Sequence, residues 1–237
     1  MISRNKIKFI QSLSLKKNRE LHQCFIVQGE KSVLELLSSD FEILELYATN
    51  EWEVAPQDIV INRLPNRCFQ RISTLKSPNK VLAIVKIPKF VIPKKEGVVL
   101  VLDNLKNPGN LGTIIRVCDW FGIEQIVCSL STVDVYNPKV VQATMGSLFR
   151  VNIIYTDLNR YLSDISTPVY AASMKGENIR KIEFPTSFHL ILGNESKGIS
   201  ATLDQFITKN VTIKNTDSKA ESLNVAVAAA IFLYESS

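Results

Sequence analysis

The stretch VVLVLDNLKNPGNLGTIIRVCDWFG, residues 98–122, joins an apolar run to a polar turn and then to a helical pattern. The apolar run predicts a buried strand over 98–103, and apolar residues at helical spacing predict a helix over 111–121. Asn110 stands where the N-cap of that helix is expected. Arg116 is long enough to lean back toward the same end of the helix. The turn predicts a polar site at the end of a strand, although a capped helix with Arg116 in a salt bridge explains most such sequences.

Beyond this stretch, apolar runs alternate with helical patterns to the end of the sequence. Strands are expected at 98–103, 123–129, 151–155, 168–173, 188–193 and 211–214, and the last helix at 222–235. Such alternation is typical of a mainly parallel sheet with helices on both faces, an α/β fold. Ligands of open α/β sheets bind at the carboxyl ends of the strands, so functional residues are expected in the loops that follow them.

The length of 237 residues allows one or two domains. Residues 86–97, KIPKFVIPKKEG, are rich in proline and lysine and predict an exposed linker. Before it, CFIVQGEKSVLELLSS predicts a strand, a glycine turn and a helix, and VLAIVKIP predicts a further strand. We therefore expect a small α/β module over 1–92 and a larger α/β domain over 93–237.

The excess positive charge lies in the small module. Residues 1–92 hold 14 Lys and Arg against 9 Asp and Glu, whereas the two signs balance over 93–237. A basic segment of this kind is typical of a protein that binds a polyanion such as RNA, and a solvated helix face is an equally good explanation. The candidate RNA-binding residues are Arg4, Lys6, Lys8, Lys16, Lys17 and Arg19.

Several classes of protein are disfavoured. The cysteines Cys24, Cys68, Cys118 and Cys128 show no CxxC spacing, which predicts buried thiols of a cytoplasmic protein without a metal site. The longest apolar run, residues 225–233, is too short to cross a membrane. The absence of GxGxxG argues against a dinucleotide-dependent oxidoreductase, and the absence of a Gly-Lys-Ser/Thr loop argues against a P-loop protein.

Two further strand ends carry polar residues. In ILGNESKGIS, 191–200, a buried strand runs into Gly193, which lets a ligand approach the backbone. Glu195 follows, and it can accept a hydrogen bond from a ligand or simply serve as a first-turn acid of the next helix. Ser222 and Asn224 precede a helix that is small or apolar on all sides, which predicts burial on every side. An N-cap and a turn residue are the simpler explanation of these two.

Taken together, three segments resemble the motifs of a known enzyme family. The family is the SpoU/TrmH family of RNA 2′-O-ribose methyltransferases, within the SPOUT superfamily. Its three motifs resemble, in this order, the segments NPGNLGTIIR, LGNESKGI and SLNVAVAAAI. The resemblance covers roughly 93–237. FIVQGEKSVLELL and SPNKVLAIVKIP are similar to the L30e-like substrate-binding domain that is often fused to these enzymes. The resemblance to the SpoU/TrmH family implies a C-terminal SPOUT α/β-knot domain. The trefoil knot of that domain is not predicted by the hydrophobic periodicity.

The resemblance also implies a function. It predicts transfer of a methyl group from S-adenosylmethionine to a ribose 2′-hydroxyl, with rRNA as the expected substrate and tRNA as the first alternative. A non-catalytic RNA-binding or ribosome-assembly protein on the same fold is the other alternative, and a homodimer through the knotted domain is implied. The implied polar site is Asn110, Arg116, Glu195, Ser222 and Asn224. The implied cofactor-binding residues are Leu192, Gly193, Ile213, Leu223 and Asn224.

The role of Arg116 in such a site stays open. Family resemblance casts it as the base, but a guanidinium loses its proton only above about pH 12. Arg116 could instead hold the adjacent phosphate, or its charge could lower the pKa of the ribose hydroxyl while another group accepts the proton.

Overall fold

The computed structural model describes residues 2–54, 56, 59–75, 80–89, 93–215, 219 and 221–236. The polypeptide forms two compact units. One comprises Met1–Lys89 and Asp134–Arg150, and the other comprises Phe90–Val133 and Val151–Ser237. The first unit therefore includes a segment from the part of the sequence where only the larger domain is expected. Residues 90–92 of the predicted linker lie outside the described residues.

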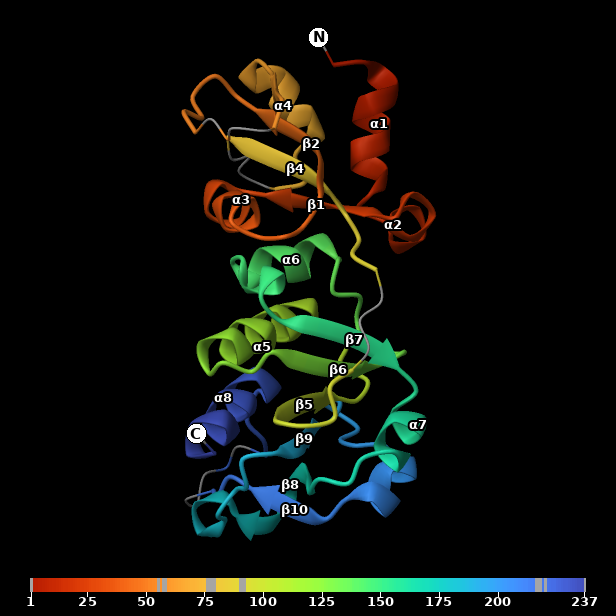
Figure 1. The fold of residues 1–237 in the computed structure, drawn as a ribbon, viewed down its shortest axis with the longest axis vertical. Helices are drawn as coiled ribbons and strands as arrows, with labels where there is room; N and C mark the ends of the chain where they lie inside the picture. Colours follow the sequence, from red (N-terminus) through yellow and green to blue (C-terminus); the bar gives the residue numbers. More distant parts are fainter. Residues whose placement is uncertain are drawn as a thin grey trace. The chain divides into compact units, whose positions relative to one another are not determined.

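The first unit is built on a mixed four-stranded sheet of order β1-β4-β2-β3 (Figure 1). Its strands are β1 Cys24–Gln28, β2 Ile43–Ala48, β3 Ile61–Arg63 and β4 Val81–Lys86. Its helices are α1 Arg4–Ser12, α2 Lys16–His22, α3 Glu30–Leu37, α4 Asn66–Ile72, α6 Pro138–Thr144 and the 3₁₀ turn η1 Ser147–Phe149. The predicted strand, glycine turn and helix are confirmed as β1, Gly29 with φ +97°, and α3.

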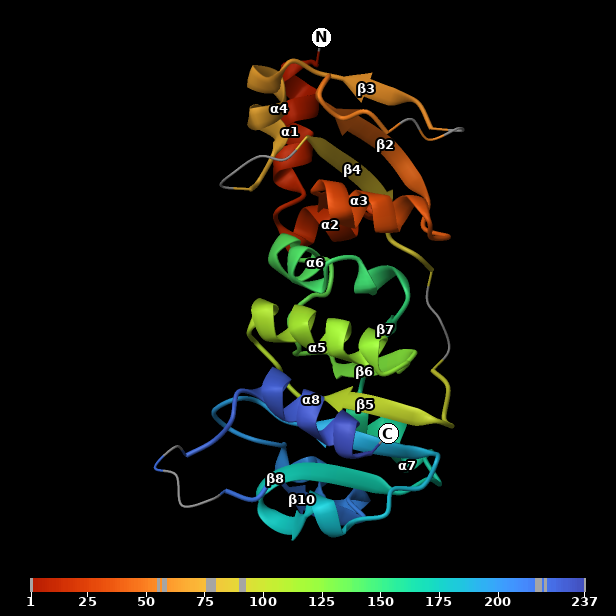
Figure 2. The same ribbon diagram turned by 90° about the vertical axis from the view of Figure 1, so that its left-hand side faces the viewer.

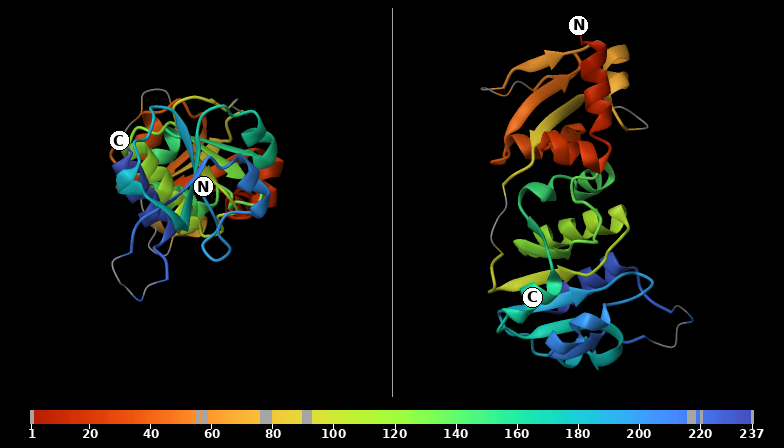
Figure 3. Two further views of the ribbon diagram at one scale, coloured as in Figure 1. Left: turned by 90° about the horizontal axis from the view of Figure 1, so that it is seen from below. Right: turned by 90° about the vertical axis from the view of Figure 1, so that its right-hand side faces the viewer.

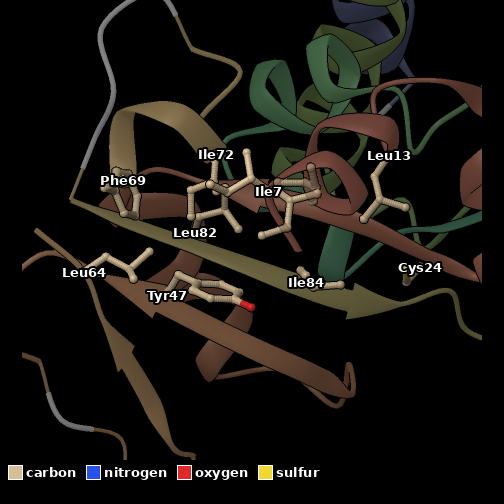
Figure 4. Packing of buried hydrophobic residues seen from close by; sticks show 11 residues of the cluster. Ile7, Leu13, Cys24, Tyr47, Leu64, Phe69, Ile72, Leu82 and Ile84 are labelled. Carbon is tan, nitrogen blue, oxygen red and sulfur yellow. The ribbon is translucent and has the colours of Figure 1, made fainter. Parts of the chain in front are cut away.

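The core of the first unit lies between its sheet and two helices. α1 and α4 pack against each other beside the sheet (Figures 2 and 3). Ile7 and Ile10 of α1 and Phe69 and Ile72 of α4 recur at helical spacing, so both helices direct an apolar stripe at Leu82 of β4 (Figure 4). Burial of each such side chain is worth roughly 1.5–3 kcal/mol. These contacts therefore stabilise the unit that carries the basic N-terminal residues.

A buried ion pair joins α2 to the segment Asp134–Arg150 within the first unit. The Arg19 side chain is 3% exposed and is paired with the Asp134 carboxylate. It also donates hydrogen bonds of 2.8 Å to the backbone carbonyls of Leu13 and Ser14. A guanidinium in the interior needs this full set of partners, because an uncompensated buried charge is strongly destabilising.

The second unit is built on a six-stranded sheet of order β10-β8-β9-β5-β6-β7, in which all neighbours are parallel. Its strands are β5 Val98–Leu102, β6 Gln125–Ser129, β7 Asn152–Thr156, β8 Val169–Asn178, β9 Phe188–Leu192 and β10 Lys209–Thr212. Its helices are α5 Pro108–Trp120, α7 Leu158–Ser163 and α8 Val225–Glu235, with 3₁₀ turns η2 Ile179–Lys181 and η3 Ala201–Phe206. Figure 1 shows α5 and α8 on one side of this sheet and α7 on the other. The predicted parallel α/β sheet is confirmed, and the trefoil knot stays a prediction.

The last helix differs from the prediction. Ala226, Ala229 and Phe232 of α8 are buried, but Val227 is 48% exposed and Tyr234 is 69% exposed. Burial on every side is therefore wrong for the single polypeptide. The inner face of α8 packs on α5, and its outer apolar face has no cover from the described residues.

A buried histidine fastens α7 to the sheet. His189 of β9 is fully buried, with its Nε2 2.8 Å from the Tyr161 hydroxyl and its Nδ1 2.9 Å from the Thr167 hydroxyl. Burial lowers the pKa of His189 to about 4, so the ring is neutral at physiological pH. Two hydroxyl partners satisfy both ring nitrogens, which makes this residue part of the core rather than of a catalytic site.

Candidate active site

Three segments of the second unit, which follow β5, β9 and β10, meet through their polar side chains. Asn110 Nδ2 donates a hydrogen bond of 2.8 Å to Glu195 Oε1. Asn224 Nδ2 donates a hydrogen bond of 3.0 Å to Asn110 Oδ1. These partners are 85 and 114 residues apart in the sequence, so the fold and not the local chain brings them together. We call Asn110, Glu195 and Asn224 the polar triad.

Asn110 is not the N-cap of its helix, and that prediction is wrong. The cap is Asn107, whose Oδ1 accepts from the backbone N–H groups of Gly109 at 2.8 Å and Asn110 at 3.3 Å. Pro108 then occupies the first helical position, where a missing N–H costs nothing. Because Asn107 caps α5, the Asn110 side chain is left to bridge the other two members of the polar triad.

Asn224 has two fixed partners. Its Oδ1 accepts from the backbone N–H of Ala226 at 2.9 Å and so caps α8, while its Nδ2 donates to Asn110. An N-cap bond of this kind is worth about 1 kcal/mol. With both ends of the amide engaged, the orientation of Asn224 is set by α8, and Asn110 is oriented in turn.

Glu195 lies on a short loop, residues 193–200, that closes on itself. The backbones of Asn194 and Gly198 exchange two hydrogen bonds of 2.9 Å. A Cβ atom on Gly193 would lie 2.3 Å from the carbonyl carbon of Gly198. Gly193 is therefore required for the loop to pack against itself, which is a different reason from the predicted approach of a ligand.

The carboxylate of Glu195 keeps one oxygen available. Glu195 is exposed, and its Oε1 accepts from Asn110. Among the residues that the structure describes, the only partner of its Oε2 is Asn194 Nδ2, at 3.5 Å. A carboxylate oxygen held by one partner and open on the other side can accept a hydrogen bond from a hydroxyl group.

Arg116 and Ser222 are not part of this hydrogen-bonded group. Both are exposed, and neither makes a hydrogen bond or ion pair with another residue that the structure describes. Six residues separate Asn110 from Arg116 on α5, which turns Arg116 about 120° around the helix. Arg116 therefore starts from another side of α5 than Asn110, and its place in the predicted site stays a prediction.

Three of the six predicted RNA-binding residues are ion-paired, and the other three have no ion-pair partner among the described residues. Arg19 is buried and ion-paired, so its assignment to RNA contact is wrong. Lys6 pairs with Glu45 at 2.7 Å, and Lys16 pairs with Glu20 at 3.6 Å. The remaining members of the set are exposed and have no ion-pair partner among the described residues: Arg4, Lys8 and Lys17.

The sequence analysis missed the residues that support the site. Asp103 and Asn104 follow β5 directly, and Asn194 precedes Glu195. All three make side-chain or backbone hydrogen bonds that connect the loops after β5 and β9. Polar residues placed immediately after a buried strand were the available signal.

Other kinds of site are not evident in the described part of the structure. No group of three or more His, Cys, Asp or Glu residues that could hold a metal ion occurs among the described residues. Cys24, Cys118 and Cys128 are buried free thiols, and Cys68 is a partly buried one. In the described ranges, no helix is both long enough and apolar enough to span a bilayer.

Both parts of the chain match known protein families. Residues 97–234 match the SpoU rRNA Methylase family, and residues 4–83 match the MRM3-like substrate binding domain. The chain belongs to the SpoU rRNA methylase family. The polar triad thus lies in the methylase domain of a SpoU-family protein, and the resemblance of the three sequence motifs is confirmed.

Relatives and solved structures match nearly the whole length of this chain. The SpoU-family chain is 31% identical to the 23S rRNA (guanosine(2553)-2′-O)-methyltransferase RlmP of Bacillus subtilis, over 97% of this chain and 94% of the relative. A putative RNA methyltransferase of the TrmH family from Porphyromonas gingivalis is 37% identical, with a TM-score of 0.91 over 99% and 98% of the two chains. An AdoMet-bound rRNA methyltransferase from Sinorhizobium meliloti is 26% identical, with a TM-score of 0.87 over 99% and 95%.

The strand ends of this SpoU-family protein fit S-adenosylmethionine. Leu223 is 49% exposed beside Asn224 and can form an apolar wall for an adenine ring. Leu192 is 2% exposed and its carbonyl accepts from the N–H of Asp103, whereas Gly193 is partly exposed, so Gly193 is the more accessible backbone at this strand end. The Ile213 side chain lines a groove between α5 and α8, and its contact with the cofactor stays a prediction. An apolar wall, backbone edges and a few polar groups are the usual components of a nucleoside site.

Proposed function

We propose that this protein is an S-adenosylmethionine-dependent methyltransferase that modifies a ribose 2′-hydroxyl of ribosomal RNA. The polar triad carries the proposal, because it joins all three sequence motifs at the carboxyl ends of the strands within a SpoU methylase domain. The names of the relatives, rRNA methyltransferases among them, support rRNA over tRNA. An rRNA substrate in turn argues for a cytoplasmic location.

The cofactor supplies the methyl group, and the protein positions both reactants. We assign its binding to Leu192, Gly193, Ile213, Leu223 and Asn224. Asn224 belongs both to these cofactor-binding residues and to the polar triad, so the polar triad adjoins the methyl donor. Holding a hydroxyl and a methyl donor in line lowers the entropic part of the barrier, which is the main contribution that a protein can make to such a transfer.

The polar triad gives the ribose a defined acceptor. Glu195 Oε2 accepts the hydrogen of the 2′-hydroxyl, and Asn110 keeps the carboxylate in place through Oε1. Arg116, a free cation on the exposed face of α5 among the described residues, holds a neighbouring phosphate. Ser222 lies two residues before Asn224 and completes the polar rim. In this scheme Arg116 is a phosphate ligand and not the base, because its guanidinium stays protonated.

Methylation of purified RNA tests the proposal. The full-length protein is incubated with isotope-labelled S-adenosylmethionine and either rRNA or tRNA from cells lacking it, and the RNA is digested and analysed by mass spectrometry. Labelled 2′-O-methylnucleosides in rRNA support the proposal, and label in tRNA alone moves the substrate to tRNA. Binding of both ligands without any label transfer would instead support the non-catalytic alternative.

We further propose that residues 1–92 grip RNA by its backbone. Arg4 and Lys8 lie one helical turn apart on α1, and both are exposed. Lys17 on α2 adds a third exposed cation. The match of residues 4–83 to a substrate-binding domain supports this assignment. Phosphate contacts of this kind give affinity and positioning without sequence selection.

Replacing Arg4, Lys8 and Lys17 together with alanine should weaken RNA binding by about 10-fold or more and reduce the salt dependence. Each lost phosphate contact lowers the slope of log K against log salt by about 0.7–0.9, so the triple variant should lose about 2. Fluorescence anisotropy with labelled rRNA over a salt series measures both. The control triple replaces Lys86, Lys94 and Lys209, which are ion-paired. Equal loss in the two triples would contradict a specific basic face.

We also propose that the protein is a homodimer that covers the outer face of α8. A groove of about 590 Å³ between α5 and α8 is lined by apolar side chains that include Val117, Val227 and Ile231. Trp120 at the end of α5 is 85% exposed, and Tyr234 is 69% exposed. A second copy of the same helices, which carries equally apolar faces, is the occupant that matches this surface.

Val227→Asp should convert a dimer to a monomer without unfolding the polypeptide. The aspartate would place a charge in the apolar contact, whereas the single chain leaves this position half exposed. Sedimentation at micromolar concentration measures the mass, and circular dichroism checks the fold. Val54→Asp, at a 38% exposed position of the first unit, is the matched control. A monomeric wild type would refute the dimer.

A further inference from the structure

Asp103 is a buried carboxylate that does not bond to the polar triad itself. It bonds instead to residues on either side of Glu195, a member of the triad. It follows β5 directly and is 5% exposed. Its Oδ2 accepts a hydrogen bond of 2.8 Å from the backbone N–H of Ser200, the last residue of the Glu195 loop. Its own N–H donates to the carbonyl of Leu192, the last residue of β9, at 2.9 Å. Asp103 therefore holds both ends of the loop that presents Glu195.

The neighbouring residue holds the side of the same loop. Asn104 has a positive φ of +57°, and its carbonyl accepts from Asn194 Nδ2 at 2.9 Å. Its N–H donates to the Ser129 hydroxyl at 2.8 Å, which links this turn to the end of β6. Asparagine is one of the few non-glycine residues that adopt this backbone region readily. The unusual conformation is therefore maintained by bonds on both sides.

Asn194 organises the inside of the loop. Its Oδ1 accepts from the N–H groups of Ser196 and Lys197, both at 3.0 Å. With the mutual backbone bonds between Asn194 and Gly198, these contacts leave the loop little freedom. Glu195 itself makes few contacts, so its position depends on this frame. The exposed side chain of Glu195 is ordered by its loop and by Asn110.

We infer that Asp103 is a positioning residue for the reaction, one that keeps Glu195 in hydrogen-bonding reach of Asn110. The inference rests on the proposed function and deepens it. A displacement of about 1 Å at a reacting group can cost about 100-fold in rate. Loss of the Asp103–Ser200 bond would release the far end of the loop, and Glu195 would no longer be held against Asn110.

The first experiment is a double-mutant cycle. Asp103→Ala should lower kcat about 100-fold in the wild-type background, with KM for RNA within about two-fold, because the first unit holds the RNA. In a Glu195→Ala background the same change should cost less than about two-fold, since Asp103 acts through Glu195. Asp103→Asn keeps an oxygen acceptor for Ser200 and should retain most of the activity. An equal loss in both backgrounds would overturn the inference.

The control and the second readout separate this inference from the function on which it rests. Asp157 makes the same kind of bond, to the backbone N–H of Arg160 at 3.0 Å, but at the start of α7. Asp157→Ala should leave kcat unchanged. Hydrogen exchange measured on the full-length protein should speed up about 10-fold at Ser200 and Gly198 in Asp103→Ala, and only there. Unchanged exchange in that loop would overturn the inference even if the wild type methylated no RNA. Should Asp103→Ala fail to fold, Ser200→Pro carries the kcat measurement and the exchange at Gly198, because proline lacks the N–H that donates to Asp103 and the φ of −64° at Ser200 suits it.

Discussion

Asn110→Asp should lower kcat by about 100- to 1000-fold with little change in RNA affinity. The substitution keeps the shape of the side chain, but it replaces the Nδ2 donor, which lies 2.8 Å from Glu195 Oε1, with a carboxylate oxygen. Two carboxylates at that distance repel each other, and Glu195 loses the partner that holds it. Loss of one oriented hydrogen bond at a reacting group commonly costs this much. Single-turnover methylation at saturating S-adenosylmethionine and RNA measures the effect.

The pH dependence of the variant gives a signature that unfolding would not. Adjacent carboxylates share a proton, so the pKa of the pair formed by Glu195 and the introduced aspartate would be raised. As pH falls through that raised value, the bound proton restores a donor toward Glu195. Activity relative to wild type should therefore increase toward acidic pH. A constant ratio at all pH values would contradict the proposed contact.

Asn107→Asp is the matched control on the same helix. Asn107 caps α5 through its Oδ1, and aspartate is an equally good N-cap that also suits the positive end of the helix dipole. We expect kcat within about two-fold of wild type and an unchanged or slightly higher Tm. A large loss in this variant would mean that any negative charge at the start of α5 disrupts the reaction.

Arg19→Met should destabilise the first unit by about 3–5 kcal/mol. The substitution leaves the Asp134 carboxylate, whose side chain is 16% exposed, without its cation, and it leaves two carbonyl groups without a donor. Removing one partner of a buried pair typically costs this amount. The Tm of the transition that reports the first unit should fall by about 12–20 °C, at about 4 °C per kcal/mol for a unit of this size. Calorimetry of the full-length protein measures it.

Two comparisons isolate the buried pair. Lys86→Met breaks a surface pair with Glu42, in which the side chains are 48% and 58% exposed, and should cost at most about 1 kcal/mol. Arg19→Met combined with Asp134→Leu removes both charges and should recover part of the loss. RNA affinity of the folded Arg19→Met protein should match wild type, because this residue faces the interior. Weaker RNA binding by that folded variant would restore Arg19 as an RNA contact.

Local patterns predicted a two-part α/β organisation, but not that the segment Asp134–Arg150 belongs to the first unit. Strand positions follow from apolar runs such as 98–103, and the observed β5 spans Val98–Leu102 with Val99 to Leu102 buried. The motif residues Asn110, Glu195 and Asn224 were predicted as one site through their family resemblance, and they do meet. The predicted start of α5 was wrong by three residues, because Asn107 and Asn110 are equally good N-cap candidates from the sequence.

The sheet and its parallel strands followed from the sequence alone, because hydrophobic periodicity and turn composition are local properties of the chain. The residues of the proposed chemistry followed from the resemblance of three motifs to a known family. Which polar groups become partners, in contrast, depends on how the chain folds. Burial of Arg19 against Asp134, the choice of Asn107 as cap and the support of Glu195 by Asp103 all join residues through packing. The local sequence around a charged or amide side chain does not show whether that side chain faces solvent or the interior. Its burial and its role depend on the partners that folding places beside it.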